Sequence, residues 1–362
     1  MLYIWQRNDL VKNYSEKSMN PTDTNTSSMF IRIPADEMQS VFYDTLIRLG
    51  FGDQQAKTCA DVFTQNSMDG VYTHGVNRFP RFVNYIKDGY VNIHNVPEMK
   101  SRFGCIEQWD GNLGPGITNA LVCTERAMEI SKTNGIGCVA LANTNHWMRG
   151  GTYGWHAAKA GFVFIGWTNT IANMPAWGST ESKLGNNPFI IAVPYNSEAI
   201  VLDAAMSQYS YGAMEKNVLT GEMLPVPGGY NTAGELTTDP SEILKSQRTL
   251  PIGYWKGSGL SLLLDILASI LSGGLAVNEI SQKKTEYALS QVFIAIDISK
   301  LNNHATIAQA VEQIINDLHQ SAKEDESKQV LYPGERVLQV RVKNLKEGIP
   351  VIRSVWEGIL LL

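Results

Sequence analysis

Hydrophobic residues recur every three or four positions along the first hundred residues of the chain. The clearest run, residues 34–49, carries Met38, Val41, Phe42 and Leu49 and is followed by Gly50. Such spacing gathers the apolar side chains on one face of a helix that the glycine ends. The same pattern predicts a second helix, capped by Asp53 and stopped by Gly70, and a third over residues 78–88. Three helices are therefore predicted before the first clear strand.

From residue 106 onward, short apolar runs alternate with helical stretches. Runs of strand length occupy residues 136–142, 162–168, 189–193, 200–203 and 291–297. Helical spacing occupies residues 117–133, 152–159, 260–271 and 307–320. Strands that alternate with helices are typical of an α/β fold. The most apolar stretch, 260–271, is interrupted by Ser261, Asp265 and Ser269, so we expect a buried helix and not a membrane span.

These patterns divide the chain into four parts. Residues 1–30 hold a polar tract with little to bury and no signal-peptide core, so we expect a disordered leader. Residues 31–105 form a helical segment that is expected to contribute to the substrate site. Residues 106–310 form the α/β core that is expected to bind cofactor and substrate. Residues 311–362 are expected to pack back on the helical part.

Composition narrows the classes of function. With 362 residues and 44% hydrophobic content, the chain can bury a sizeable core. Its net charge of −5 argues against nucleic acid as a partner. The cysteines Cys59, Cys105, Cys123 and Cys138 lie far apart without a C-x-x-C pair. Four reduced thiols in a cytoplasmic protein are the simplest interpretation.

The stretch from Val71 to Phe82 places His74 four residues before Arg78. Residues four apart share a helix face, so both side chains can reach one cleft. Imidazole exchanges a proton near neutral pH, and a guanidinium binds a carboxylate through two parallel hydrogen bonds. The pair suits an acid that also carries a reducible carbonyl or an oxidisable hydroxyl. The alternative is structural: His74 would satisfy a turn and Arg78 would lie on the surface.

Polar loops follow the predicted strands. Residues 143–151 directly follow strand 136–142 and contain His146, a second candidate acid or base. A histidine packed beside Trp147 is the structural alternative. Residues 167–170 and 183–188 add short polar side chains, which singly are more often turn chemistry.

Residues 254–259 open the most hydrophobic helix with two glycines and Lys256, which favours an anion such as phosphate. A simple glycine turn is the alternative. The usual G-x-G-x-x-G fingerprint is absent, because none of the three G-x-G pairs has its third glycine. A nucleotide cofactor is therefore not expected in the ordinary Rossmann manner. No His, Asp or Glu spacing predicts a metal site.

Five motifs together resemble the type-2 malate/L-lactate dehydrogenase family. They are THGVNRFPRF at 73–82, NHWMRGG at 145–151, WTN at 167–169, GNNP at 185–188 and GYWKGSG at 253–259. The resemblance runs from about residue 31 to the C-terminus. It implies an NAD(P)-dependent oxidoreductase with a non-Rossmann cofactor fold and a mixed sheet, acting as a homodimer on 2-keto or 2-hydroxy acids.

The resemblance also implies roles for single residues. His74 matches the proton donor of the family, His146 matches a second active-site histidine, and Arg78 matches the arginine that holds the substrate carboxylate. Thr73 and Asn187 are expected to contact substrate as well. Cofactor contacts are expected at Ala199, Ile200, Val201, Leu202, Asp203, Ala204, Ala205, Trp255, Lys256, Gly334, Glu335 and Arg336.

Two positions depart from the family pattern. Thr73 stands where many members have serine, which keeps the hydroxyl and adds a methyl group. Glu335 stands where a close relative has histidine, which leaves the preference between NADH and NADPH open. NADH is the expected cofactor, and NADPH is possible.

The substrate expected from the resemblance is a sugar acid, 2,3-diketo-L-gulonate, reduced to 3-dehydro-L-gulonate. Malate, L-lactate, ureidoglycolate and sulfolactate are alternatives within the same class. A metal-dependent hydrolase that uses His74 and His146, or a non-catalytic sugar-acid binding protein, would be a different class of function.

Overall fold

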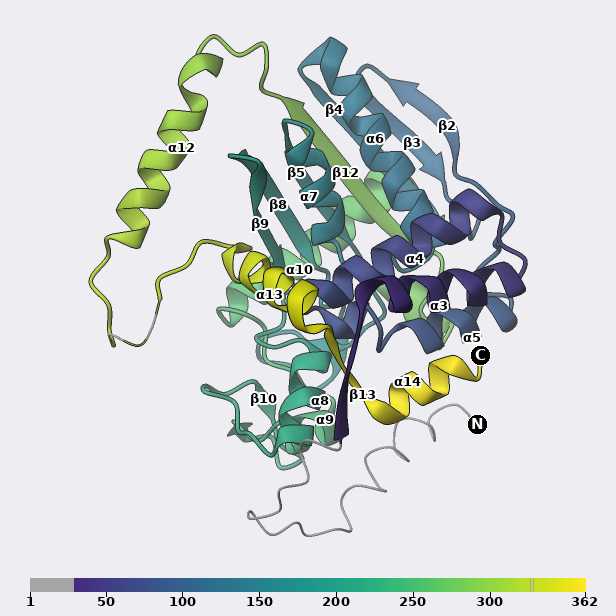
Figure 1. The fold of residues 1–362 in the computed structure, drawn as a ribbon, viewed down its shortest axis with the longest axis vertical. Helices are drawn as coiled ribbons and strands as arrows, with labels where there is room; N and C mark the ends of the chain where they lie inside the picture. Colours follow the sequence, from purple (N-terminus) through teal and green to yellow (C-terminus); the bar gives the residue numbers. More distant parts are fainter. Residues whose placement is uncertain (1–28, 326, 328) are drawn as a thin grey trace.

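A computed structural model describes residues 29–325, 327 and 329–362, and the expected leader lies almost wholly outside these residues. Figure 1 shows a central twisted sheet with helices on both faces and a helical lobe beside it. The sheet contains seven strands in the order β2-β3-β4-β12-β5-β8-β9. Its members are Glu98–Phe103 (β2), Ile106–Asp110 (β3), Ile136–Thr144 (β4), Phe162–Thr168 (β5), Phe189–Tyr195 (β8), Glu198–Ala204 (β9) and Leu289–Asp297 (β12).

The sheet is mixed, which confirms the α/β fold with a mixed sheet. Strands β3 and β4 run parallel, whereas β4, β12, β5, β8 and β9 follow one another antiparallel. Within this run of five strands, β4, β5 and β9 therefore point the same way, and their carboxyl ends lie at the same end of the strands. The loops after Thr144, Thr168 and Ala204 consequently start from the same edge, although these three strands are not neighbours.

Helices cover both faces of the sheet because its strands alternate their side chains between them. Val139 and Leu141 of β4 pack on one face against α6 (Gly116–Asn134) and α7 (Gly151–Lys159). Cys138 and Ala140 point to the other face and pack with Leu264 and Ala268 of α10 (Trp255–Ser272).

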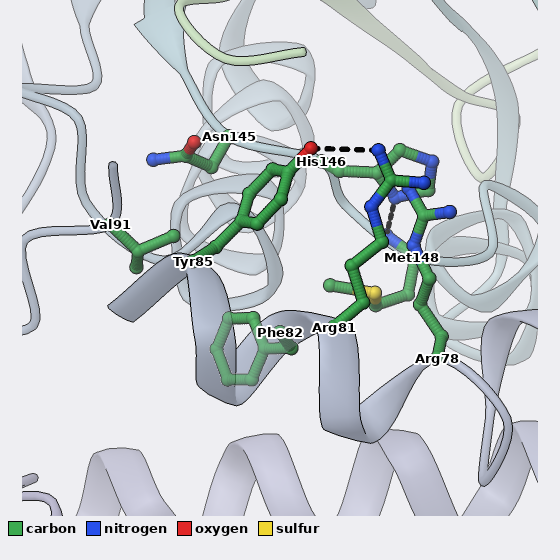
Figure 2. A pocket seen from close by; sticks show the side chains of 8 residues that line it. All are labelled: Arg78, Arg81, Phe82, Tyr85, Val91, Asn145, His146 and Met148. Atoms are coloured by element: carbon green, nitrogen blue, oxygen red, sulfur yellow. Dashed lines mark hydrogen bonds between the residues drawn. The ribbon is translucent and has the colours of Figure 1, made fainter. Parts of the chain in front are cut away.

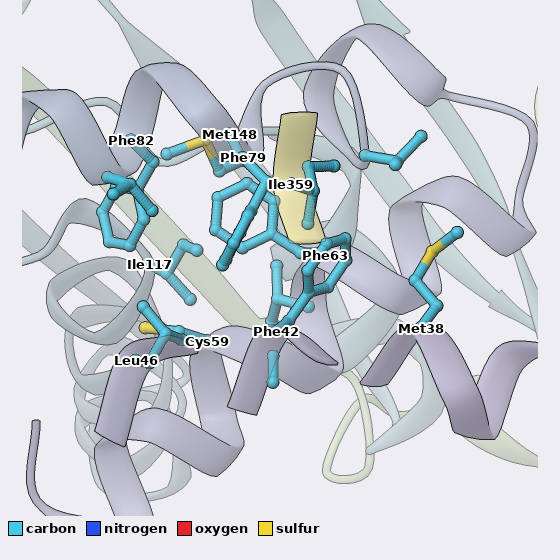
Figure 3. Close-up of a cluster of buried hydrophobic side chains, with 14 of the residues drawn as sticks. Met38, Phe42, Leu46, Cys59, Phe63, Phe79, Phe82, Ile117, Met148 and Ile359 are labelled. Carbon is cyan, nitrogen blue, oxygen red and sulfur yellow. The ribbon is translucent and has the colours of Figure 1, made fainter. Parts of the chain in front are cut away.

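The helical lobe is built from α3 (Ala35–Arg48), α4 (Asp53–Met68) and α5 (Phe79–Lys87), at the positions predicted. One detail differs: Gly52, not Asp53, is the N-cap of α4, and no side chain caps it. In the core of the lobe, Phe42 stacks on Phe79 at 4.2 Å between ring centroids (Figure 3). Ile359 of α14 (Arg353–Leu360) belongs to the same core, which brings the end of the chain onto this lobe.

The prediction that three helices precede the first strand is wrong. Strand β1 (Phe30–Ile33) comes before them and pairs antiparallel with β13 (Ile349–Ile352). Four residues are too few to show a period, and the partner lies more than 300 residues away, so no local pattern reveals the pair.

The remaining elements are short or peripheral. They are η1 (Tyr72–His74), β6 (Met174–Pro175), β7 (Ser182–Leu184), α8 (Tyr211–Thr220), β10 (Gly229–Tyr230), β11 (Leu236–Thr237), α9 (Pro240–Ser246), α11 (Val277–Gln282), α12 (His304–His319) and α13 (Glu335–Glu347). Among the described residues, no helix is both long and apolar enough to cross a membrane.

The prediction that residues 260–271 form a fully buried helix is wrong for one side of α10. The buried positions of α10 follow one stripe, Gly257, Ser261, Leu264, Asp265, Ala268 and Ser272. The opposite side exposes Leu260, Leu262, Leu263, Ile266, Leu267 and Ile270, each by 39% or more. High apolar content indicates burial but does not say what covers each face, and the sheet packs against the buried stripe of α10.

Candidate active site

His74 lies in a short 3-10 turn, η1, between α4 and α5. Two side chains of α4 hold this turn: the Asn66 amide donates to the His74 carbonyl at 3.0 Å, and the Val76 N–H donates to Ser67 Oγ at 2.8 Å. Gly75 permits this approach, because a Cβ there would lie 2.3 Å from Ser67 Oγ. The sequence Thr-His-Gly thus fixes the histidine at the sheet side of the helical lobe.

The structure brings the two predicted histidines together. The rings of His74 and His146 stack with centroids 5.6 Å apart and planes 16° from parallel. The Met148 N–H donates to His146 Nδ1 at 2.9 Å, so Nδ1 accepts and the proton of a neutral ring sits on Nε2. Thr73 Oγ1 lies 3.2 Å from His74 Nδ1 and fixes the orientation of that ring.

Both imidazoles are neutral at physiological pH. Burial, followed by repulsion from Arg78 and Arg149, lowers the pKa of His74 to about 3. Burial is also the main cause that lowers the pKa of His146, with further repulsion from Arg78, His74 and Arg81. Two uncharged rings can stack closely, and an anion bound beside them would remove part of the repulsion.

Arg78 and Arg81 extend from the start of α5 along the same side, toward His146 (Figure 2). Together with Tyr85, Asn145 and His146 they line one small cavity. Its volume is about 20 Å³, room for about one water molecule, so an organic acid can bind only if side chains move apart.

The arginines of this cavity are held differently. Arg78 lies 3.4 Å from Glu286, whose other oxygen accepts from the Ile171 N–H. Arg81 donates to the Tyr85 hydroxyl at 2.7 Å. Arg81, Tyr85 and Glu286 were not predicted as site residues. Arg81 follows Arg78 by three positions on a helix, and that spacing was a usable signal. Glu286 reaches Arg78 from 208 residues away, which no local pattern reveals.

Arg149 belongs to a buried ionic network. It pairs with Asp69 at 2.5 Å, and its Nε lies 3.8 Å from Asp203. Arg341 of α13 also binds Asp69, through two hydrogen bonds of 2.7 and 3.1 Å. This network ties the histidine loop to the end of α4, to β9 and to α13.

Asn187 lies at the predicted strand start, but its amide group is already engaged. It accepts from the Thr170 N–H at 3.1 Å and donates to the carbonyl and hydroxyl oxygens of Ser261. Contact between Asn187 and a substrate would have to displace one of these bonds.

The three segments expected to contact cofactor are neighbours in space. The Val201 N–H donates to the Pro333 carbonyl at 2.9 Å, which places β9 against Gly334. The Ile252 N–H donates to the Met206 carbonyl at 2.8 Å, which places the end of the same segment against the start of α10. The Gly151 N–H donates to Asp203 at 2.7 Å, so this region also adjoins the histidine loop.

All four cysteines are free thiols, as predicted. Among the described residues, no group of three or more His, Cys, Asp or Glu side chains is arranged to hold a metal ion.

Two stacked histidines beside a guanidinium can place a carboxylic acid within reach of an imidazole. The malate/L-lactate dehydrogenase family model matches residues 33–360, and the chain belongs to this family of oxidoreductases.

Related proteins with curated names cover almost the whole chain. A protein from Klebsiella pneumoniae (strain 342) named 2,3-diketo-L-gulonate reductase is 42% identical over 330 residues, 91% of this chain and 99% of its own length. A protein of the same name from Citrobacter koseri has the same identity and coverage. Among solved structures, malate dehydrogenase from Entamoeba histolytica superposes with a TM-score of 0.86 at 25% identity, covering 91% of this chain and 96% of the other.

Proposed function

We propose that the protein reduces 2,3-diketo-L-gulonate to 3-dehydro-L-gulonate with NADH. One observation carries the proposal: His146 and Arg78 line one cavity, and the ring of His74 stacks on the ring of His146. Two relatives at 42% identity carry the name of this reductase. In the reaction a hydride adds to the C2 carbonyl carbon and a proton adds to its oxygen, so the ketone becomes a secondary alcohol.

Arg78 binds the substrate carboxylate, which holds the ketone beside the imidazoles. The negative charge also offsets the repulsion that Arg78 exerts on the His74 ring. Substrate binding therefore raises the pKa of His74 and lets it hold the proton that the developing alkoxide takes.

His146 acts as a hydrogen-bond donor to the reacting oxygen. Its Nδ1 accepts from the Met148 N–H, so the Nε2–H is the only proton that a neutral ring can present. A neutral imidazole would have to become an anion to give that proton away. The two histidines therefore divide the work: His74 supplies the proton and His146 polarises the carbonyl.

A nicotinamide dinucleotide fits the segments around β9, in a non-Rossmann manner. Ala199–Ala205, Trp255, Lys256 and Gly334–Arg336 would hold it, and when bound it supplies the hydride. A Cβ at Gly334 would lie 3.2 Å from Trp155 and 3.3 Å from the Val201 nitrogen, so the glycine lets this segment pack closely against β9. The Glu335 carboxylate accepts from the Tyr332 N–H and lies 2.9 Å from His319 Nε2. A carboxylate suits ribose hydroxyls and repels a 2′-phosphate, which favours NADH over NADPH.

A homodimer in the cytoplasm completes the proposal. The exposed side of α10 carries leucine and isoleucine. Between Trp255 and Ser272, the charged residues are Lys256 at the start of the helix and the buried Asp265. A face without charges can pack against its own copy about a twofold axis. We expect Leu263→Asp to convert a dimer into a monomer in analytical ultracentrifugation. Four free thiols suit a reducing compartment.

The test is a panel of 2-keto acids with NADH and with NADPH, followed by loss of nicotinamide absorbance. We expect the highest kcat/KM for 2,3-diketo-L-gulonate with NADH. Preference for oxaloacetate would instead support a malate dehydrogenase, the name of the Entamoeba protein with the same fold. Absence of oxidation with every acid of the panel would contradict the proposal.

A further inference from the structure

The cavity contains a second guanidinium and a phenol that the proposed chemistry does not use. Arg81 and Tyr85 follow Arg78 on the inner side of α5, at positions three and seven residues later. Arg81 donates to the Tyr85 oxygen at 2.7 Å, and its guanidinium lies 5.1 Å from the centre of the Tyr85 ring (Figure 2). The two side chains therefore act as one unit.

Arg81 and Tyr85 have hydrogen-bond donors that their mutual hydrogen bond does not use. The Tyr85 oxygen accepts from Arg81, so its own O–H is directed elsewhere, and Arg81 has four more N–H donors. Across the cavity, the side-chain amide of Asn145 donates hydrogen bonds to the carbonyls of Tyr90, Leu113 and Gly114. Its buried Oδ1 has no hydrogen-bond partner among the described residues. A ligand that both accepts and donates hydrogen bonds would satisfy all three side chains.

The charges favour a ligand that carries a single negative charge. Glu286 and Glu215 both act electrostatically on Arg81, and Glu286 also pairs with Arg78. Two carboxylates thus already balance the two guanidiniums. One substrate carboxylate at Arg78 is tolerable, whereas a second one at Arg81 would face both glutamates. Neutral hydroxyl and keto oxygens at Arg81 avoid that repulsion.

We propose that Arg81, Tyr85 and Asn145 select substrates with a polyhydroxy tail, by binding the oxygens beyond the reacting carbonyl. The inference rests on the proposed function and adds the residues that separate a sugar acid from a short 2-keto acid. Arg81 and Tyr85 both line the cavity and are joined by their mutual hydrogen bond. A longer substrate must exchange their mutual hydrogen bond for bonds to itself.

Tyr85→Phe is the sharpest test, because it removes one oxygen and keeps the ring. We expect kcat/KM for 2,3-diketo-L-gulonate to fall about tenfold, the typical effect of one neutral hydrogen bond, while kcat/KM for pyruvate stays within about twofold. Arg81→Gln should lower the first value about 100-fold, since a charged donor is lost, and again spare pyruvate. Tyr43→Phe is the matched control, since its hydroxyl binds Asp53 on the far side of the lobe.

Equal losses for both substrates would overturn the inference and make Arg81 and Tyr85 general supports of the site. Unchanged values for the sugar acid in both variants would overturn it as well. Binding of L-gulonate and of L-lactate, measured by calorimetry, does not depend on turnover. The inference is supported if the wild-type enzyme binds L-gulonate more tightly than L-lactate and Tyr85→Phe removes this difference. That result holds even if another sugar acid is the substrate. Equal binding of both acids to the wild-type enzyme contradicts it, whatever keto acid the enzyme reduces.

Discussion

Two segments of the chain each place an arginine shortly after a histidine, and the two arginines lie in different surroundings. Arg78 follows His74 and lines the cavity, 3.4 Å from Glu286. Arg149 follows His146 and is 6% exposed, bound to Asp69 at 2.5 Å. Both arginines lower the pKa of His74 by repulsion. Of these two arginines, only Arg78 lines the cavity.

The difference shows that a charged residue in a motif has to be judged by its partners. Arg149 and Arg341 saturate Asp69, so this network holds the loop, the lobe and α13 in place. Arg78 has a longer contact with Glu286 and faces a cavity. We infer that Arg149 contributes to stability and Arg78 to binding, and the following changes test that division.

The largest effect is expected for His74→Asn. The amide preserves polarity but cannot supply a proton, so kcat should fall by about 10²- to 10⁴-fold with little change in folding. The measurement is steady-state NADH oxidation with the best 2-keto acid. His156→Asn is the matched control, since His156 lies on α7 beside the exposed Glu125. Near-normal turnover in the His74 variant would remove this residue from the chemistry.

Asp69→Asn should reduce stability more than any change in the cavity. It removes the nearer of the two carboxylates beside the buried Arg149 and leaves only Asp203 at 3.8 Å, and breaking a buried ion pair typically costs about 3–5 kcal/mol of unfolding free energy. Urea unfolding followed by tryptophan fluorescence measures this loss. Lys100→Gln is the control, because its pair with Glu98 is exposed on both sides and should contribute less than about 1 kcal/mol. Equal stability of the two variants would show that the network is dispensable.

The sequence predicted the histidines and the arginine of the site better than the carboxylates that hold the arginines in place. His74 and Arg78 were visible because a proton-exchanging side chain and a cation stand four residues apart, although the structure places them in separate elements, η1 and the N-cap of α5. Glu286 and Asp69 were not visible, since their partners lie 208 and 80 residues away. Likewise, the helices of the lobe followed from their apolar spacing, whereas the pairing of β1 with β13 depends on contacts between the two ends of the chain.

The polar loops at strand ends show the same limit. His146 follows one predicted strand and Asn187 precedes another, so the sequence made both of them candidate site residues. In the structure, Asn187 is fully engaged by Thr170 and Ser261, whereas one nitrogen of His146 is left to face the cavity. Residue type and position predict which side chains gather at an edge, but hydrogen-bond partners decide which of them can serve a substrate.

Arg78→Gln is expected to affect binding and not folding. Loss of a charge-assisted hydrogen bond to the carboxylate should lower kcat/KM by about 10- to 150-fold, mostly through KM. Arg149→Gln should do the reverse, with reduced stability and a smaller change in KM for the folded fraction. Arg102→Gln, on an exposed part of β2, is the control for loss of a guanidinium. If both site variants change KM equally, the proposed division of roles is wrong.

The smallest effect concerns pH, and its sign follows from the buried imidazoles. In the folded state the pKa of His74 is about 3, against about 6.5 in the unfolded chain. Between these values the unfolded state binds more protons, so acidification favours unfolding. His74 should contribute up to about 1.4 kcal/mol per pH unit between about pH 6.5 and its folded-state pKa, and nothing above about pH 7.5. Urea unfolding at pH 7.5 and pH 5 should therefore give a smaller difference for His74→Asn than for the wild type. If the difference is unchanged, the His74 ring is already charged at pH 5 in the folded protein. Proton uptake by His74 would then not depend on binding of the substrate carboxylate.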